Sequence, residues 1–457
     1  MLFSSLTFLY VFLPAVLIVY FLAPRRWKNA VLLAFSLVFY GWGEPKYILL
    51  MVCSILSFYG FGIAVERAAR LRKLCLILSV SLGVLLLGIF KYADFLISTI
   101  NGVFGSQIPL GNLALPVGIS FYLFQCISYV VDVYRGDTPA QKNVVAFGTY
   151  VALFPQLIAG PIVRYTDIAG QLSDRRESWE GFSCGIFRFL IGLGKKVLIA
   201  NRMGELISVF RSSQNPSVVF YWLYAVSFML QLYYDFSGYS DMAIGLGQIF
   251  GFSFPENFNY PYLSASVTEF WRRWHMSLGS WFRDYVYIPM GGNRVCRGRW
   301  IVNILTVWML TGLWHGANWN FVLWGLLFGL LLLLEKTVFP VKKLPGLLRH
   351  GYVLLVVLFS FVLFNAADVV QAGQDIAAML GLTHIPGMTV ETQYYLRSNL
   401  VLLLAAILGA TPLPATLGRK VREKAPWAQP VLLILLLLLC SGYLVDGSFN
   451  PFLYFRF

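Results

Sequence analysis

Residues 1–24 read MLFSSLTFLYVFLPAVLIVYFLAP, a mostly apolar run of roughly 20 residues, which is the length that an α-helix needs to cross a bilayer. No Lys or Arg precedes the apolar run, and the run is longer than the hydrophobic part of a cleaved signal peptide. We therefore expect this segment to be retained as a first transmembrane span.

Comparable apolar stretches recur along the 457 residues, and some are too short or too interrupted by Gly and Pro to cross a bilayer alone. They predict an all-α polytopic membrane protein with roughly ten to twelve complete spans and one or two broken or re-entrant pieces. The stretches lie at approximately 2–22, 30–43, 47–64, 74–92, 115–133, 144–162, 184–209, 217–250, 301–313, 317–338, 351–366, 398–412 and 428–445.

The composition supports the same class of protein, because 58% of the residues are hydrophobic and only 12% are charged, against roughly 25% charged in soluble domains. The 35 Lys and Arg exceed the 21 Asp and Glu and give a formal charge of +14. In a membrane protein such an excess gathers in cytoplasmic loops beside anionic lipid. We therefore expect membrane lipid, and not nucleic acid, as the partner of these charges, and the cell membrane as the location.

The first loops predict the orientation of the chain. Basic residues cluster at 25–28, 67–73 and 135–142, whereas the loop at 44–46 pairs one Lys with one Glu and residues 94–115 contain no Lys or Arg. The positive-inside rule then places the three basic loops in the cytoplasm and the amino-terminus outside the membrane.

One region departs from the lipid-facing pattern. Between Asp235 and Arg299 acidic, basic and amide side chains alternate with aromatic residues and Gly, and no apolar window long enough to span survives. Polar chain at membrane depth is tolerated where protein buries it or where it lines a water-filled cavity. We expect residues 269–294 to form helices at the rim or wall of an internal chamber.

Four histidines are present, and two of them, His350 and His384, lie in loop contexts without a predicted role. His315 stands between two strongly apolar runs, flanked by Trp314 and Gly316. A polar ring in that setting needs a hydrogen-bond partner or a function, so it is either a packing residue bonded to a backbone carbonyl or a catalytic base or ion relay.

The fourth histidine, His275, lies in TEFWRRWHMSLGSWFRDY (268–285). If this stretch is one helix, Trp271, Trp274 and His275 share one face. The alternative is an amphipathic helix at the membrane interface with an aromatic belt.

Several familiar catalytic patterns are absent from the sequence. We find no G-x-S-x-G, P-loop, H-E-x-x-H or dinucleotide motif, and the six cysteines form no C-x-x-C pair. These absences argue against a serine hydrolase, an ATP-driven pump and a zinc protease, and they predict no permanently bound cofactor or metal. An imidazole can still take a proton from a hydroxyl that attacks an activated acyl group.

Six ordered motifs resemble the membrane-bound O-acyltransferase family, and within it the alginate O-acetyltransferase branch. They are LVFYGWGEPKYILL (37–50), LPVGISFYLFQCISYVVDVYRG (115–136), LFPQLIAGPIVRY (153–165), YYDFSGYSDMAIGLGQIFGFSFPENFNYPY (233–262), EFWRRWHMSLGSWFRDYVYIPMGGNR (269–294) and LTGLWHGANWNFVLWG (310–325). The resemblance implies a bowl-like helical core with a central funnel. Its catalytic histidine maps onto His315 and its second polar position onto His275.

This resemblance implies one membrane-embedded acyltransferase domain over residues 1–457. The motifs occupy a core of about 30–340, and the helices of 341–457 match no motif. We interpret Trp271, Trp274, Trp314 and Asn318 as chamber-lining, substrate-binding residues. His315 would act as the general base, and His275 would position or polarise the carbonyl of the acyl donor.

The predicted reaction moves an acyl group, acetyl by preference, from a cytoplasmic thioester to a hydroxyl of an extracytoplasmic polysaccharide or a secreted partner protein. Acetyl-CoA or an acyl-carrier protein would supply the thioester as a substrate. The family also contains teichoic acid D-alanyl transferases, which gives one alternative. A transporter or flippase of a lipid-linked intermediate is another, and a scaffold for polysaccharide export is a third.

Overall fold

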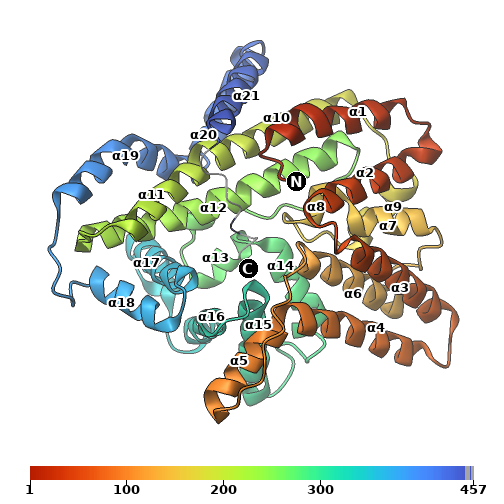
Figure 1. The fold of residues 1–457 in the computed structure, drawn as a ribbon, viewed down its shortest axis with the longest axis horizontal. Helices are drawn as coiled ribbons and strands as arrows, with labels where there is room; N and C mark the ends of the chain where they lie inside the picture. Colours follow the sequence, from red (N-terminus) through yellow and green to blue (C-terminus); the bar gives the residue numbers. More distant parts are fainter. Residues whose placement is uncertain (448–452, 454–457) are drawn as a thin grey trace. The chain divides into compact units, whose positions relative to one another are not determined.

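The computed structural model describes residues 1–447 and 453, and Figure 1 shows that this part of the chain is built from helices. Within the described residues, strand pairing is limited to one isolated antiparallel bridge between Phe258 and Trp274. The predicted all-α polytopic fold is confirmed.

The described chain divides into two compact units. Residues 1–189 and 240–255 form unit 1, and residues 190–239 and 256–457 form unit 2. The helices α10 (Trp179–Gly194) and α12 (Val218–Ile249) each contribute residues to both units. The single domain expected from the sequence therefore stays a prediction.

Unit 1 contains nine further α-helices and three short helices of other types. They are η1 (Phe8–Phe12), α1 (Leu13–Leu22), η2 (Arg25–Trp27), α2 (Lys28–Gly43), α3 (Ile48–Arg67), α4 (Arg72–Leu87), η3 (Gly88–Tyr92), α5 (Ala93–Phe104), α6 (Ile119–Arg135), α7 (Val144–Ala152), α8 (Phe154–Leu157) and α9 (Tyr165–Ser173).

Unit 2 contains the remaining helices. They are η4 (Lys195–Ala200), α11 (Asn201–Ser212), η5 (Pro261–Leu263), α13 (Val267–Arg273), α14 (Met276–Phe282), η6 (Arg283–Tyr287), α15 (Arg297–His315), α16 (Trp319–Thr337), η7 (Val341–Lys343), α17 (Gly346–Asn365), α18 (Val369–Met379), α19 (Val390–Gly409), α20 (Leu413–Lys424) and α21 (Ala428–Asp446).

Among the described residues, five helical segments are long and apolar enough to cross a membrane, and a sharply bent pair, α19 with α20, raises the number to six. The five are Ile48–Arg67, Arg72–Phe104, Trp319–Thr337, Gly346–Asn365 and Ala428–Asp446. The ten to twelve complete spans expected from the sequence exceed this number. Several apolar stretches are broken into shorter helices, as residues 144–162 are into α7 and α8, and α6 carries buried polar residues.

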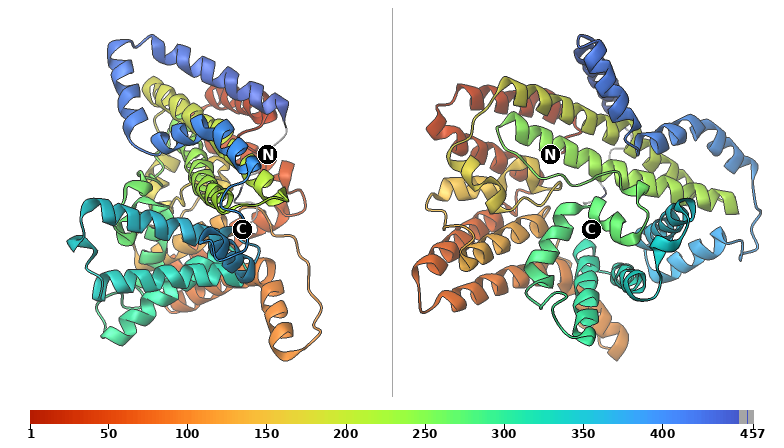
Figure 2. Two further views of the ribbon diagram at one scale, coloured as in Figure 1. Left: turned by 90° about the vertical axis from the view of Figure 1, so that its left-hand side faces the viewer. Right: turned by 180° about the vertical axis from the view of Figure 1, so that it is seen from behind.

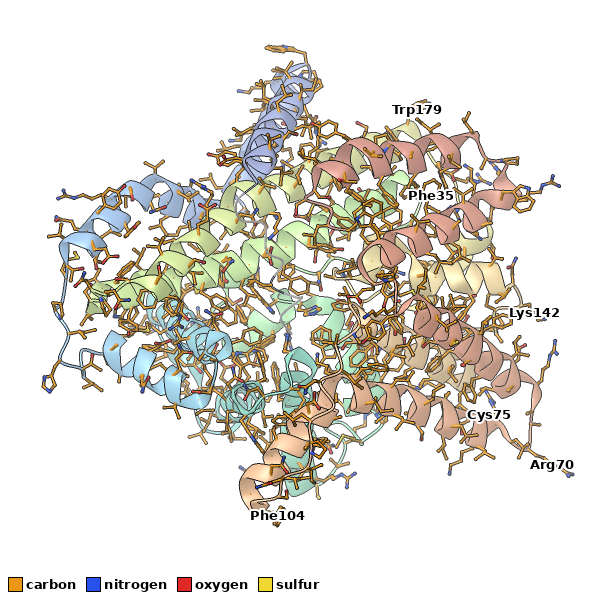
Figure 3. All side chains as sticks on the ribbon, viewed as in Figure 1. Phe35, Arg70, Cys75, Phe104, Lys142 and Trp179 are labelled. Carbon is orange, nitrogen blue, oxygen red and sulfur yellow. The ribbon has the colours of Figure 1, made fainter. Side chains whose placement is uncertain are left out.

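Two of the basic loops of unit 1, at 67–73 and 135–142, lie at one edge. The Glu66 carboxylate accepts a hydrogen bond from the Ala140 N–H, which ties the end of α3 to the loop that precedes α7. Figure 3 shows the side chains of Arg70 and Lys142 pointing outward at this edge. The amino-terminus lies instead beside Gly43, at the turn between α2 and α3. This segregation agrees with the charge pattern, and the orientation in the cell stays a prediction.

In unit 2, α15 and α16 form a tightly packed pair that carries the candidate site (Figure 1). A Cβ atom added at Gly312 would lie 2.2 Å from the Phe321 carbonyl oxygen, and one at Gly325 would lie 2.2 Å from the Trp308 carbonyl oxygen. The two backbones can approach this closely only because both positions are glycine. The packing fixes the end of α15, where His315 stands.

Candidate active site

His275 occupies a break between two short helices. The helix α13 ends at Arg273, Trp274 is extended, and His275 precedes α14 with a φ of 46°. This left-handed conformation is uncommon for a residue with a side chain. The expectation that Trp271, Trp274 and His275 share one helix face is therefore wrong, because the helix stops before Trp274.

A neighbouring extended segment holds this break in place. The Met276 N–H donates to the Asn257 carbonyl over 3.0 Å, and the Asn259 N–H donates to the Arg273 carbonyl over 2.9 Å. These two bonds bracket His275 from both sides. These backbone hydrogen bonds hold His275 in its left-handed conformation despite the strain.

The side chain of Asn257 selects the tautomer of His275. Its Oδ1 accepts hydrogen bonds from the Ser277 N–H at 3.3 Å and from the Ser277 Oγ at 2.9 Å, so this atom is the amide oxygen. The same oxygen lies 3.1 Å from Nδ1 of His275. Because an amide oxygen only accepts, the hydrogen-bond network assigns the proton to Nδ1 and the lone pair to Nε2.

Nε2 of His275 is buried and makes no hydrogen bond with any residue in the described part of the chain. The ring lies outside the candidate spans, and burial lowers the pKa of His275 well below 6.5. The nearby His315 lowers this pKa further, because two adjacent positive charges repel each other. His275 is therefore neutral at physiological pH, with Nε2 available as an acceptor.

His315 is the last residue of α15, and its ring lies in an aromatic cluster with His275. The two imidazole centroids are 6.4 Å apart, although the residues are separated by a long stretch of sequence. His315 also contacts the rings of Trp324 at 5.2 Å and Phe364 at 5.3 Å. Both histidines are buried, so the structure brings the two predicted catalytic residues together in a shielded setting.

This geometry bears on the role predicted for His275, to position or polarise the carbonyl of the acyl donor, which stays a prediction. Polarising the carbonyl of an acyl donor requires an N–H at Nε2, and the tautomer fixed by Asn257 places the N–H at Nδ1. The ring can accept a hydrogen bond or a proton at Nε2.

Of the four residues predicted to line the chamber, Trp314 lies at the histidine pair. Its ring centroid is 5.6 Å from that of His275 and 4.9 Å from that of His315. Trp271 is one ring further away, since it contacts Trp324 at 5.5 Å. Trp271 therefore reaches the histidine pair only through Trp324, which contacts His315.

The other two predicted lining residues serve the fold. Trp274 stacks on Phe270 at 5.5 Å and contacts Phe361 at 5.4 Å within the core of unit 2. Asn318 caps α16, because its Oδ1 accepts the Trp319 N–H and its amide donates to the Ala367 carbonyl. Their predicted contact with substrate stays a prediction without a supporting contact.

The sequence interpretation missed four neighbours of the histidine pair. They are Phe236, Asn257, Trp324 and Phe364. The first three fall within motifs that carry the family resemblance, but no periodicity or charge distinguishes them there. Phe364 lies in a plain apolar run beyond the motifs.

Residues 269–294 form short helices as expected, within α13, α14 and η6. Their charges lie away from the histidines, since Arg272 and Arg283 are exposed and Arg273 pairs with Glu269 over 2.8 Å. In the described residues, no group of three or more His, Cys, Asp or Glu side chains could hold a metal ion. That this region forms a chamber wall stays a prediction.

The chain is similar in sequence to a family of acyltransferases and to several of its members. The family model described as membrane-bound O-acyltransferase matches residues 141–369. The chain is 38% identical to the probable alginate O-acetylase of Pseudomonas putida over 100% of both chains. It is 32% identical to the peptidoglycan O-acetyltransferase of Helicobacter pylori, covering 90% of this chain and 86% of the relative. A more distant relative is the teichoic acid D-alanyltransferase of Bacillus subtilis, 30% identical over 56% of this chain and 69% of its own length.

Proposed function

The chain belongs to the membrane-bound O-acyltransferase family, and from that premise we propose that it transfers an acetyl group from a cytoplasmic thioester to a sugar hydroxyl on the other side of the cell membrane. The O-acyltransferase class follows from the family. The donor, the acyl group, the acceptor and the roles of individual residues are the proposal.

Two relatives support acetyl and a glycan acceptor. The probable alginate O-acetylase aligns over the whole of both chains, and the peptidoglycan O-acetyltransferase over most of both. Both names describe acetylation of a carbohydrate polymer. The D-alanyl transferase aligns over little more than half of this chain, which makes D-alanine the weaker alternative. A secreted protein that passes the acetyl group on to the polysaccharide fits the same chemistry.

The observation that carries the proposal is the buried pair of His275 and His315, with ring centroids 6.4 Å apart. His315 takes the proton from the acceptor hydroxyl as its oxygen attacks the thioester carbonyl. The carbon–sulfur bond then breaks, and the proton passes from His315 to the departing thiolate. The products are an ester and a free thiol, and a general base of this kind contributes about 10²- to 10⁴-fold.

His275 positions the acceptor in this scheme. Its Nε2 is an acceptor without a partner among the described residues, and a sugar carries hydroxyl groups next to the one that reacts. A hydrogen bond from such a neighbouring hydroxyl to Nε2 would orient the attacking oxygen. Since the like-charge effect lowers the pKa of His275, protonation of His315 during the reaction also keeps His275 neutral.

The thioester is a substrate in this proposal. Acetyl-CoA and an acetylated acyl-carrier protein both supply the required acyl–sulfur bond, and no group that the chain holds permanently takes part in the steps above. A transporter of a lipid-linked intermediate would move its cargo without breaking that bond.

Thiol release therefore tests the function. The purified protein in vesicles should release free thiol from acetyl-CoA, or from an acetylated carrier, when an oligosaccharide acceptor is present. His315→Ala should reduce this release by about 10²- to 10⁴-fold while protein yield is retained. His384→Ala is the matched control, because that histidine is exposed in a loop outside the cluster. Wild-type release by a well-folded His315→Ala protein would overturn the assignment.

A further inference from the structure

The helix α20 (Leu413–Lys424) connects two apolar helices near the end of the chain. It follows α19 (Val390–Gly409) after a bend of 78° and precedes α21 (Ala428–Asp446). Figure 2 shows α19, α20 and α21 as successive helices that turn sharply at each junction. The spanning window of α21 is only 6% buried within the protein, which leaves its surface for lipid. Because α20 ends four residues before this span begins, it lies near one face of the membrane.

The helix α20 has an apolar face, and two of its basic residues lie on the opposite side. Leu413, Leu417 and Val421 follow one another at intervals of four residues and therefore share one face. Their exposed fractions are 49%, 52% and 39%, so the described protein does not cover this face.

The basic face carries Arg419 and Arg422, and Lys420 and Lys424 flank the apolar residues, three positions after Leu417 and Val421. All four basic side chains are exposed, and Glu423 is the acidic residue of the helix. The helix therefore has a net charge of +3, from four basic residues and one acidic residue. None of the four basic side chains forms an ion pair within the part of the chain that the structure describes. The charges are free to meet an anionic surface.

Trp427 also indicates that this part of the chain lies at the membrane surface. It lies between α20 and α21, and 71% of its surface is exposed. Tryptophan rings favour the boundary between lipid headgroups and acyl chains. Its place directly before an apolar span puts that boundary at residues 425–428.

We propose that α20 lies in the plane of the membrane surface and binds anionic phospholipid. Its apolar face enters the upper acyl chains, and Arg419 and Arg422 on the opposite face contact the negatively charged headgroups. The long side chains of Lys420 and Lys424 extend from the edge of the apolar face to the same headgroups. The excess of basic residues assigns this surface to the cytoplasmic leaflet. The helix then fixes the depth at which α19 and α21 enter the bilayer. This role does not depend on the acyl transfer proposed above.

The depth of two neighbouring positions tests the placement. Single cysteines at Leu417→Cys and Arg419→Cys, in a background without the native cysteines, carry a nitroxide label in vesicles that contain phosphatidylglycerol. Dissolved oxygen should reach the label at position 417 and a water-soluble nickel complex should not. The label at position 419 should show the opposite preference. Equal access of the nickel complex to both labels would overturn the proposal.

The charge requirement has a separate test. Thermal unfolding of the full chain is measured in phosphatidylcholine vesicles with and without phosphatidylglycerol. The wild type should unfold at a higher temperature with the anionic lipid, and this shift should shrink as salt is added. Replacing the four basic residues of α20 by Gln should remove most of the shift, whereas Arg419→Lys with Arg422→Lys should retain it.

A matched control is available in η7, whose Lys342 and Lys343 lie in another basic segment of unit 2. Lys342→Gln with Lys343→Gln should keep the lipid-dependent shift. An unchanged shift in the α20 Gln variant would overturn the proposal. A loss of binding to an acidic acyl-carrier protein in the same variant, with the lipid shift intact, would assign the basic face to a soluble partner instead.

Discussion

At the scale of single residues, one amide oxygen decides the chemistry that His275 can perform. Asn257 accepts hydrogen bonds from both donors of Ser277, and this fixes its identity as the oxygen that faces Nδ1 of His275. The lone pair of Nε2 follows from that contact. A residue that touches no substrate in this scheme therefore determines what the histidine can bind.

Removal of this oxygen should weaken catalysis through the histidine. In Asn257→Leu the Nδ1–H loses its acceptor, and a buried donor without a partner costs roughly 1–3 kcal/mol, or about 5- to 150-fold in rate if the correct tautomer is lost. Steady-state acetyl transfer measures the effect. Ser277→Ala is the control, because it removes a hydrogen bond to the same oxygen without touching the ring. Equal losses in both variants would mean that Asn257 only supports the backbone, whereas near-full rescue by Asn257→Asp would support the tautomer argument.

His275 and His315 should differ in the kinetic step that they affect. His275→Ala should raise the KM for the glycan acceptor more than it lowers kcat, since the ring orients a hydroxyl and does not take its proton. The KM for the thioester should stay unchanged, because the neutral tautomer cannot hold the donor carbonyl. A raised thioester KM in this variant would instead support the carbonyl-polarising role of His275.

The pH dependence of acceptor binding follows from the lowered pKa of His275. An imidazole whose pKa is lowered remains neutral as the pH falls through the ordinary pKa of a histidine side chain. The acceptor KM of the wild type should therefore stay constant from neutral pH to below 6.5 and should rise only in more acidic solution. A KM that rises at or above pH 6.5 would contradict the neutral, buried imidazole, and the His275→Ala protein should show no such transition at any pH.

At the scale of helices, the packing of α15 against α16 places His315. In Gly312→Ala the new methyl group would meet the Phe321 carbonyl oxygen at 2.2 Å, so the helices must separate. Overpacking of this kind costs about 1–3 kcal/mol, and the displacement acts directly on the end of α15. We expect a lower unfolding temperature together with reduced activity. Gly298→Ala, in the same helix but with no atom within 4 Å of its added Cβ, should leave both unchanged.

The helices themselves show which parts of the site the sequence could predict. The strongly apolar runs identified α3, α16, α17 and α21, and the family motifs identified both histidines. The break at Trp274 was not predictable from periodicity, because it depends on backbone hydrogen bonds from residues 257–259. For the same reason the contacts of Trp274 with Phe270 and Phe361 in the core of unit 2 were not predictable. Long-range contacts of this kind leave no local signal.

At the scale of the whole molecule, the proposed reaction requires a protein with two chemically different sides. In that proposal, a cytoplasmic thioester and an extracytoplasmic sugar reach the same pair of histidines. The charge pattern predicts the direction, since the basic loops that contain Arg70 and Lys142 lie at one edge of unit 1 while residues 94–115 carry no Lys or Arg. The loop that ends at Ala114 lies instead beside the turn between α2 and α3, where Tyr47 donates a hydrogen bond to the Ala114 carbonyl over 2.8 Å.

This asymmetry predicts which loops an impermeant reagent can label in intact cells. A cysteine introduced at Arg70, in the basic turn between α3 and α4, should be protected from outside, because basic loops stay in the cytoplasm. A cysteine at Ile108, exposed in the loop without basic residues, should be labelled readily. Both positions belong to unit 1, so the pair reports the orientation of one compact body, and permeabilised cells should expose position 70 as the control. Labelling of position 70 from outside, with position 108 protected, would show that the protein has the opposite orientation in the membrane. The donor and acceptor would then bind on the sides opposite to those proposed.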